Sequence, residues 1–380
     1  MTKVVLYVII KLPLSNVAFL PFLTLNSNKS KIIIFGRKTK KIKGTKIFWG
    51  QQEIGIVNSW KYLGITLYRL STFKSHLKEL KKTLSQKQNA LIGIFKCKHL
   101  NNFAYHKKLF NSLILSTLLY AGPVWAWSLI NELEAIQNVF YRRLFNLPYL
   151  TPEYLLHAEL QTKPLKHQIL KTTFTFWKKL IRTKSPQNAH WWWTYWLDNP
   201  SQTYNPIANF IQELSIPLKL KHIPLSRQTL DQLSEIQNST NTNLLEKLHL
   251  SIQNRINTST YFPHYKHIHN SNNNGNVYLK MSVPWVIKKF ITQLRINPNQ
   301  ISTPAGQVIM SNTQVCQLCK AGKMTWTHLL KFCRAVTNNT TKPYRFKTPR
   351  NTNEFYSQTI PKISLPEAWY LLRIVKLFNF

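Results

Sequence analysis

The chain has very few acidic residues for its size. Its 380 residues include 13 Asp and Glu against 51 Lys and Arg, which gives a formal net charge of +38. The only aspartates are Asp198 and Asp231, and no acidic residue precedes Glu53. A polymerase needs several carboxylates that converge on two metal ions. The sequence therefore predicts no such catalytic centre and no magnesium site.

Cysteine and long apolar runs are also scarce. Four cysteines do not make a disulfide framework in so long a chain, and three of them cluster with a histidine. This usage favours a reducing intracellular compartment, the nucleus or the cytoplasm. No run of 18 apolar residues is present, so no membrane-spanning helix is predicted. The apolar run 4–10 is followed by Lys11 and Pro13 without an Ala-x-Ala pattern, which argues against a signal peptide.

The excess of positive charge indicates a polyanionic partner. Membrane-binding helices concentrate Lys and Arg on one polar face, whereas here the basic residues are spread along most of the chain. We therefore expect nucleic acid, and not a membrane surface, as the partner.

A short strand is predicted over residues 60–67. Leu63, Ile65 and Leu67 alternate with their neighbours, which is the period-two pattern of a half-buried strand. A glycine inside a strand is typical of a place where another backbone or a ligand comes close. Because Gly64 follows Lys61 and Tyr62, the pattern indicates contact with a phosphate backbone.

Helices are predicted over residues 73–95, 109–118 and 133–144, together forming a small bundle, with Pro123 as the break between the last two. The first helix carries an apolar stripe at four-three spacing, about seven turns long. Lysines lie off this stripe, at Lys74, Lys78, Lys81, Lys82 and Lys87. They either contact a nucleic-acid backbone or form a solvated face.

A second group of cations precedes this region, between a strand predicted at 32–35 and a hairpin predicted from 47–49 and 54–57. Its members are Arg37, Lys38, Lys40, Lys41 and Lys43. Five cations on one loop make either a solvated tip or a phosphate contact.

The region after the helices is less specific. The tryptophan-rich stretch 190–196 is expected to fill a core more than to stack on bases. From 202 to 276 the chain is polar, and 270–276 is predicted as a loop. His264, His267 and His269 have no Cys or carboxylate neighbours, so a metal site is not expected there. An apolar helix is predicted to follow Pro284.

The most specific local pattern is Cys316-x2-Cys319-x8-His328-x4-Cys333. Two cysteines two residues apart can hold one ion from a tight turn, and a His and a Cys five positions apart can complete a tetrahedral set. Thiolate ligands favour zinc over magnesium or calcium. The alternative is three buried thiols beside an unrelated histidine.

Several of these patterns together resemble the reverse transcriptases of non-LTR (LINE-type) retrotransposons, such as the jockey group. The resemblance rests on Lys61 to Ile65, the basic helix, Leu119-Tyr120 with Trp125, and the C-terminal Cys-Cys-His-Cys motif, and outside that motif it covers roughly residues 25–183. It implies that the Tyr-Leu-Gly segment is a primer grip and that the helices after it are a thumb that holds the template-primer duplex.

The resemblance has three further consequences. The segment Leu25-Asn26, Lys29 and strand 32–35 resembles the palm, which implies that Asn26 and Lys29 lie near the nucleotide site. The family's catalytic Tyr/Phe-Ala-Asp-Asp motif would lie before residue 25, and residues 1–24 do not contain it. The family often has a Glu four residues before the motif's histidine, where this chain has Met324.

The predicted fold class is α+β, mostly α. The expected parts are an N-terminal extension (1–24), a palm remnant with a primer-grip-like strand (25–70), a thumb-like bundle (71–150), a helical connector with Asn-rich loops (151–300), a zinc-knuckle-like module (301–340) and a basic tail (341–380). The predicted function is that of a truncated reverse transcriptase that lacks the catalytic aspartates, with structural zinc and an RNA or RNA/DNA hybrid as partner. An intact retrotransposon polymerase acting in trans is a further candidate partner. The alternative is a non-enzymatic, host-adopted RNA-binding or scaffold protein.

Overall fold

The computed structural model describes residues 5–9, 30–35, 46–49, 52–70, 72–95, 102–182, 227–271, 276–303, 306–344 and 346–378. The strands are β1 (Val5–Ile9), β2 (Lys31–Phe35), β3 (Ile47–Trp49), β4 (Gln52–Ile54), β5 (Ser59–Tyr62), β6 (Ile65–Tyr68), β7 (Gln300–Thr303), β8 (Gly306–Ile309), β9 (Ser311–Val315) and β10 (Lys323–Met324). The helices before residue 183 are α1 (Lys74–Ile94), α2 (Phe103–Leu109), η2 (Phe110–Leu115), α3 (Ser116–Leu118), α4 (Gly122–Trp125), η3 (Ala126–Leu129), α5 (Ile130–Phe145), α6 (Glu153–Leu160) and α7 (Leu165–Arg182). The later helices are α10 (Arg227–Thr258), α11 (Tyr265–Ser271), α12 (Val277–Lys280), α13 (Trp285–Ile296), α14 (Trp326–Lys331), α15 (Arg334–Asn339), α16 (Thr352–Glu354), η5 (Phe355–Thr359) and α17 (Leu365–Lys376).

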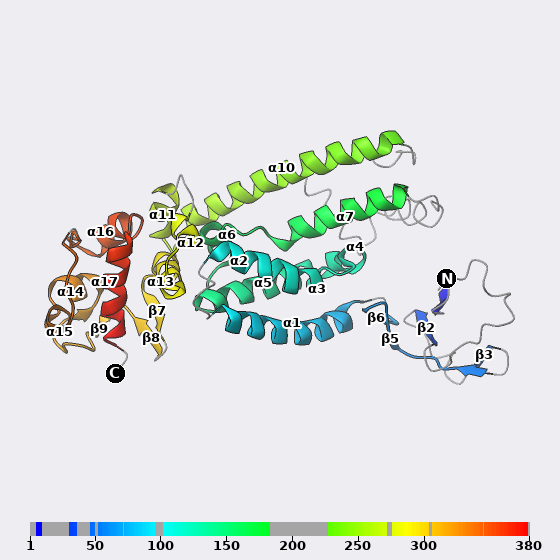
Figure 1. Cartoon of the computed structure of the whole chain (residues 1–380), viewed down its shortest axis with the longest axis horizontal. Helices are drawn as coiled ribbons and strands as arrows, with labels where there is room; N and C mark the ends of the chain where they lie inside the picture. Colours follow the sequence, from blue (N-terminus) through cyan, green and yellow to red (C-terminus); the bar gives the residue numbers. More distant parts are fainter. Residues whose placement is uncertain are drawn as a thin grey trace.

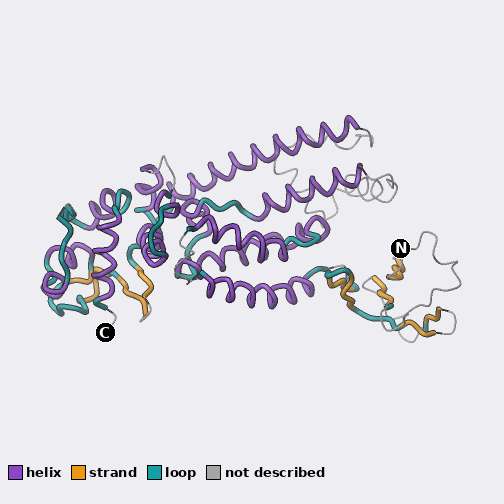
Figure 2. Tube along the Cα trace, in the orientation of Figure 1, coloured by secondary structure: helices purple, strands orange, loops and turns teal. Residues whose placement is uncertain are grey.

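The described chain is mostly helical, with small antiparallel sheets, as the predicted α+β class requires. Each sheet has two strands, paired as β1–β2, β3–β4, β5–β6, β7–β8 and β9–β10. Figure 1 shows an elongated molecule with β2 and β3 at the N-terminal end, the helices in the middle and α14 to α17 at the other end. Figure 2 shows how the strands are confined to these two ends.

The predicted strand over residues 60–67 is wrong, because this segment is a hairpin. Strands β5 and β6 pair with Tyr62 opposite Ile65, so Leu63 and Gly64 form a two-residue turn. Both turn residues have positive φ, 45° for Leu63 and 86° for Gly64. A two-residue turn with φ above zero at both positions matches the twist of the flanking strands, and glycine adopts it without strain. Gly64 is therefore explained by the turn.

The helices predicted for this region are present, and α1 packs against η2, α3 and α5. Helix α1 buries Leu77, Leu80, Leu84 and Leu91, the stripe that its spacing predicted. Helices α2, η2 and α3 follow one another without a break, and α5 covers the third predicted segment. Pro123 stands in the first turn of α4, after Ala121 in the left-handed region. None of the described helices alone is long and apolar enough to span a membrane, and the bent pair 103–118 with 122–145 meets that criterion only jointly.

The expected Asn-rich loops are partly helical. Asn238, Asn241 and Asn243 lie within α10, a helix of 32 residues that runs beside α7 (Figure 1). Lys178 Nζ on α7 donates to Gln237 Oε1 on α10 at 2.7 Å. In the expected loop 270–276, residues 272–275 lie outside the described residues, and Asn276 is buried.

Two outer segments contain regular secondary structure. The N-terminal extension contributes β1, which pairs with β2 from Val5 opposite Phe35 to Ile9 opposite Lys31. The expected basic tail contains α17, whose start has a Ser364–Glu367 capping box. The apolar face of α17 is buried, and the helix packs on α13 and β7. Within the described residues, both β1 and α17 therefore pair with or pack on other elements.

Candidate metal centre and nucleic-acid interface

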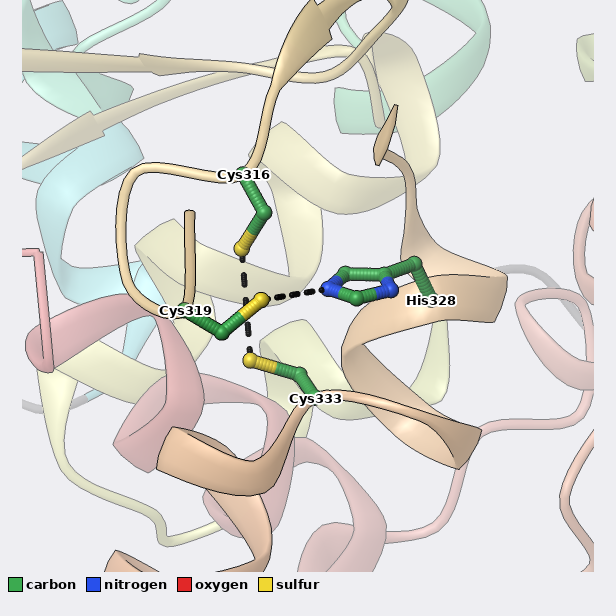
Figure 3. Close-up of side chains that lie close together, drawn as sticks. All are labelled: Cys316, Cys319, His328 and Cys333. Carbon is green, nitrogen blue, oxygen red and sulfur yellow. Dashed lines mark hydrogen bonds between the residues drawn. The ribbon is translucent and has the colours of Figure 1, made fainter. Parts of the chain in front are cut away.

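The four predicted metal ligands come together. One ligand atom from each of Cys316, Cys319, His328 and Cys333 lies within 4.8 Å of the others. Cys316 Sγ is 3.9 Å from Cys333 Sγ, and Cys319 Sγ is 3.1 Å from His328 Nε2. Figure 3 shows the four side chains pointing toward one common point. The group is close enough to bind one metal ion such as zinc.

Local structure explains how the chain reaches this arrangement. Cys316 follows the end of β9, and its backbone N–H donates to Gly322 O at 2.6 Å, which closes the turn that carries Cys319. Lys320 has φ of 59° at the bend. The Thr325 hydroxyl caps α14 by accepting from the backbone N–H of His328 at 3.2 Å. Cys333 is the residue just before α15.

Gly322 is required for the position of His328. A Cβ at Gly322 would lie 2.3 Å from two atoms of the His328 ring, a distance that no real contact allows. With a side chain at this position, the His328 ring would have to leave the place from which it contacts Cys319. Nothing in the ligand spacing of the sequence indicated this role.

Met324 occupies the position where the resembling family often has Glu. It lies in β10 and is almost completely buried. A carboxylate there would be buried away from water, at a large cost in free energy without a partner. The departure from the family pattern therefore fits an apolar environment and leaves the four ligands intact.

The thiols have different pKa values. Burial opposes ionisation of Cys319, but hydrogen bonds from the backbone N–H of Ala321 and from His328 lower the pKa of its thiol to about 6. Burial raises the pKa of the Cys333 thiol to about 11, against the opposing backbone N–H of Val336.

The distances fit tetrahedral zinc. Zn–S bonds of about 2.3 Å place two sulfur ligands roughly 3.8 Å apart, and a sulfur and a nitrogen ligand roughly 3.6 Å apart. The observed 3.9 Å edge agrees with the first value, and the 3.1 Å edge is somewhat shorter than the second. The two measured contacts share no atom, so they are opposite edges of the ligand set. Three cysteines and one histidine are typical of structural zinc sites.

The candidate nucleic-acid residues around Gly64 lie beside a groove. The groove, about 370 Å³ in volume, lies between the β5–β6 hairpin, α1 and α3, and its lining includes Lys61, Gly64, Glu79, Thr83 and Tyr120. The place of a Cβ on Gly64 is 3.2 Å from the Tyr120 ring, so the close neighbour of this glycine is an aromatic side chain.

The hairpin is fixed to α1 by residues that the sequence did not indicate. Thr66 Oγ1 donates to Glu79 Oε2 at 2.9 Å, and the Thr66 backbone N–H donates to His76 Nδ1 at 3.4 Å. His76 in turn meets Trp125 edge to face, with ring centroids 4.8 Å apart. Burial lowers the pKa of His76. A neutral ring suits its role as the acceptor for Thr66.

Of the five predicted lysines of α1, Lys87 lies on the groove side, where its Nζ donates to Thr117, and the other four lie away from the groove. With 3.6 residues per turn, Lys74, Lys78, Lys81 and Lys82 fall on an arc whose centre is roughly 140° from that of His76, Glu79 and Thr83. We call these four lysines the lysine row. All four are exposed, and among the described residues none has a carboxylate oxygen within 4.0 Å. The structure therefore separates the groove and the lysine row onto different flanks of α1.

The other predicted contacts lie outside the described residues, and so does the tryptophan stretch 190–196. These contacts are Asn26, Lys29, Arg37, Lys38, Lys40, Lys41 and Lys43. Tyr62 is half-buried in β5, directly before the turn.

Comparison with known proteins finds a similarity to a transposon RNA-directed DNA polymerase. A stretch of 128 residues, 33% of this chain, is 27% identical to the probable RNA-directed DNA polymerase from transposon BS of Drosophila melanogaster. The matched stretch spans 14% of the length of that protein. No protein-family model and no solved structure matches the chain.

Proposed function

We propose that this chain is the palm-remnant, thumb and C-terminal region of a non-LTR retrotransposon reverse transcriptase and that it binds the backbone of RNA or of an RNA/DNA hybrid. The observation that carries the proposal is the lysine row, four exposed cations on one flank of a rigid helix. Cations spaced along a helix can each neutralise a phosphate and release a counterion. The similarity to a transposon reverse transcriptase and the net charge of +38 support the same partner.

The second part of the proposal concerns the metal. Cys316, Cys319, His328 and Cys333 hold one zinc ion, which when bound supplies a structural cross-link and no chemistry on substrate. The thiols need a reducing compartment to stay free for the metal, so the proposed location is the nucleus or the cytoplasm.

The third part is that this chain does not polymerise by itself. Its two aspartates, Asp198 and Asp231, are far in the sequence from the palm-like segment at 25–70, so that segment has no aspartate to bind a catalytic metal ion. Primer extension on an RNA template with magnesium or manganese is expected to give background signal. Extension that persists in a preparation cleared of contaminating polymerases contradicts this part of the proposal and leaves the binding part standing.

The binding test measures fluorescence anisotropy of a labelled RNA/DNA hybrid over a range of salt concentrations. Replacing the four residues of the lysine row with Gln is expected to weaken binding and to flatten the plot of log affinity against log salt by about 0.9 per lost phosphate contact. Loss of backbone contacts is expected to affect all sequences alike.

The matched control removes four exposed lysines from helices on the other side of the bundle: Lys171, Lys179, Lys247 and Lys266. If binding depends only on net charge, this variant loses as much affinity and slope as the first. Equal losses in the two variants, or an unchanged slope in the lysine-row variant, refute the proposed interface.

A further inference from the structure

A second group of metal-ligating side chains lies in the helical bundle. One oxygen of Glu134, one oxygen of Glu153 and one ring nitrogen of His157 lie within 4.8 Å of one another. Glu134 comes from α5, while Glu153 and His157 stand four residues apart on α6. Residues four apart share a helix face, so α6 presents both groups toward α5.

Glu134 is an unusual carboxylate in this chain. Its relative exposure is only 8%, and its Oε1 accepts the backbone N–H of Lys166 at 3.0 Å. Its Oε2 is buried and has no hydrogen-bond partner among the described residues. Burial raises the pKa of Glu134. A buried oxygen left without a partner is costly, and a bound cation removes that cost.

His157 is oriented for ligation. Its Nδ1 lies 3.1 Å from the carbonyl oxygen of Thr162 and 2.9 Å from the Thr162 hydroxyl. When Nδ1–H donates to the carbonyl, the neutral ring keeps the lone pair on Nε2, which is 3.4 Å from Glu153 Oε1. Metal-ligating histidines commonly donate their other ring N–H to a backbone carbonyl in this way.

We propose that Glu134, Glu153 and His157 form a second metal site, which takes a zinc ion or a similar divalent transition metal. Bonds of about 2.0–2.1 Å to nitrogen and oxygen place two ligands of a tetrahedral ion roughly 3.3–3.4 Å apart, which matches the His157–Glu153 distance. An imidazole ligand favours zinc over magnesium and calcium. The Glu153 side chain is 45% exposed, so the fourth ligand is water from that side. The ion joins α5 to α6.

Charges near the group predict the order of filling. Lys166 and Arg255 act on Glu153 and reduce the negative charge available to a cation. The thiolate site has three anionic ligands once it is loaded, whereas this site has two. We therefore expect the Cys316–Cys333 site to fill first and the new site to fill at higher free zinc.

The experiment titrates zinc into the metal-free full chain against a chromophoric chelator. The expected stoichiometry is two ions per wild-type chain. Glu134→Gln and Glu153→Gln each lose the weaker ion and keep the tighter one, whereas Cys319→Ser keeps the weaker ion. The matched control is Glu132→Gln, which removes the same charge two residues earlier in α5 and keeps both ions.

Glu153→Gln keeps the test valid if Glu134→Gln fails to fold, because Glu153 is partly exposed and not part of the packed core. Far-UV circular dichroism checks that its helix content is unchanged. A single ion per wild-type chain that Glu153→Gln retains, or a weaker ion that survives in Glu153→Gln, overturns the proposal. The group is then a contact between His157 and Glu153 that holds no ion. Neither result bears on nucleic-acid binding or on the thiolate site.

Discussion

Glu159 and Arg295 are separated by 136 positions in the sequence and form a completely enclosed ion pair, with Arg295 Nε donating to Glu159 Oε1 at 2.7 Å. The hydroxyls of Tyr265 and Tyr278 donate to the same carboxylate, each at 2.7 Å. These three charge-assisted contacts satisfy a carboxylate that water cannot reach. The pair joins α6 to α11, α12 and α13, and so joins the bundle to the C-terminal half.

Replacing Arg295 with Met is expected to lower the free energy of unfolding by about 3–5 kcal/mol, because Glu159 is left as a buried charge without its cation. Urea unfolding followed by circular dichroism measures the change. The control Arg334→Met removes an exposed arginine and is expected to stay within about 0.5 kcal/mol of wild type. If Arg295→Met lowers the free energy of unfolding by no more than Arg334→Met does, the prediction is wrong, and water reaches the Glu159 carboxylate.

Removal of zinc by a chelator is expected to lower the stability of the C-terminal module while the bundle keeps its helices. Cys316, Cys333 and Trp326 belong to the main hydrophobic core, so the effect should also reach the packing of α14 against Phe355. His328→Ala should loosen the metal, whereas the exposed His267→Ala should not. If wild type and Cys316→Ser contain equal amounts of zinc, the four residues do not form a zinc site, and the cysteines are three buried thiols.

Gly322→Ala is expected to weaken zinc binding without removing any ligand, because the new Cβ takes the place of the His328 ring. Competition with a chelator of known affinity measures the change. The control is Gly93→Ala in α1, where a Cβ meets nothing within 4 Å. That substitution should leave zinc affinity unchanged and add about 0.5–1 kcal/mol of stability by favouring the helix. Unchanged zinc affinity in Gly322→Ala shows that His328 can bind from another position.

The protein is expected to become less stable as the pH is lowered, because the buried His264 resists protonation in the folded state. Burial lowers the pKa of His264 to about 4, against a usual value of 6.5, so the folded chain keeps this ring neutral while the unfolded chain protonates it. Between pH 6.5 and 4 the unfolded state therefore binds more protons, and the free energy of unfolding drops by up to about 1.4 kcal/mol per pH unit. His264→Gln should flatten this slope over that window, and the exposed His249→Gln should not. If the free energy of unfolding has the same pH dependence in wild type and in His264→Gln, the prediction is wrong, and water reaches the His264 ring.

The sequence predicted those parts of the fold that depend on short-range spacing. The leucines of α1 and the four metal ligands are regular or local patterns, and the structure places both as expected. The 60–67 hairpin was missed because apolar alternation continues through its turn, where Leu63 is 64% exposed in spite of its type. The sequence marked this turn only weakly, by Gly64, because glycine readily adopts the positive φ that such a turn requires.

Other features had weak local signals or none. Helix α10 has no clear apolar stripe, so its polar sequence suggested loops. Helix α17 had a readable start in Ser364, Pro366 and Glu367. The contacts of Glu159 with Arg295, and of Glu134 with His157, join residues that no spacing relates. They exist only once the helices have packed.

The position of the lysine row and the groove on different flanks of α1 has a geometric consequence. A helix with its side chains is about 10–12 Å across, so two strands bound on these flanks are held about one helix width apart. The groove side carries its own cations, since Lys61 lines it and Lys87 Nζ donates to the groove residue Thr117 at 2.8 Å. A strand held by the proposed lysine-row interface would therefore lie on a different flank of α1 and leave the groove uncovered.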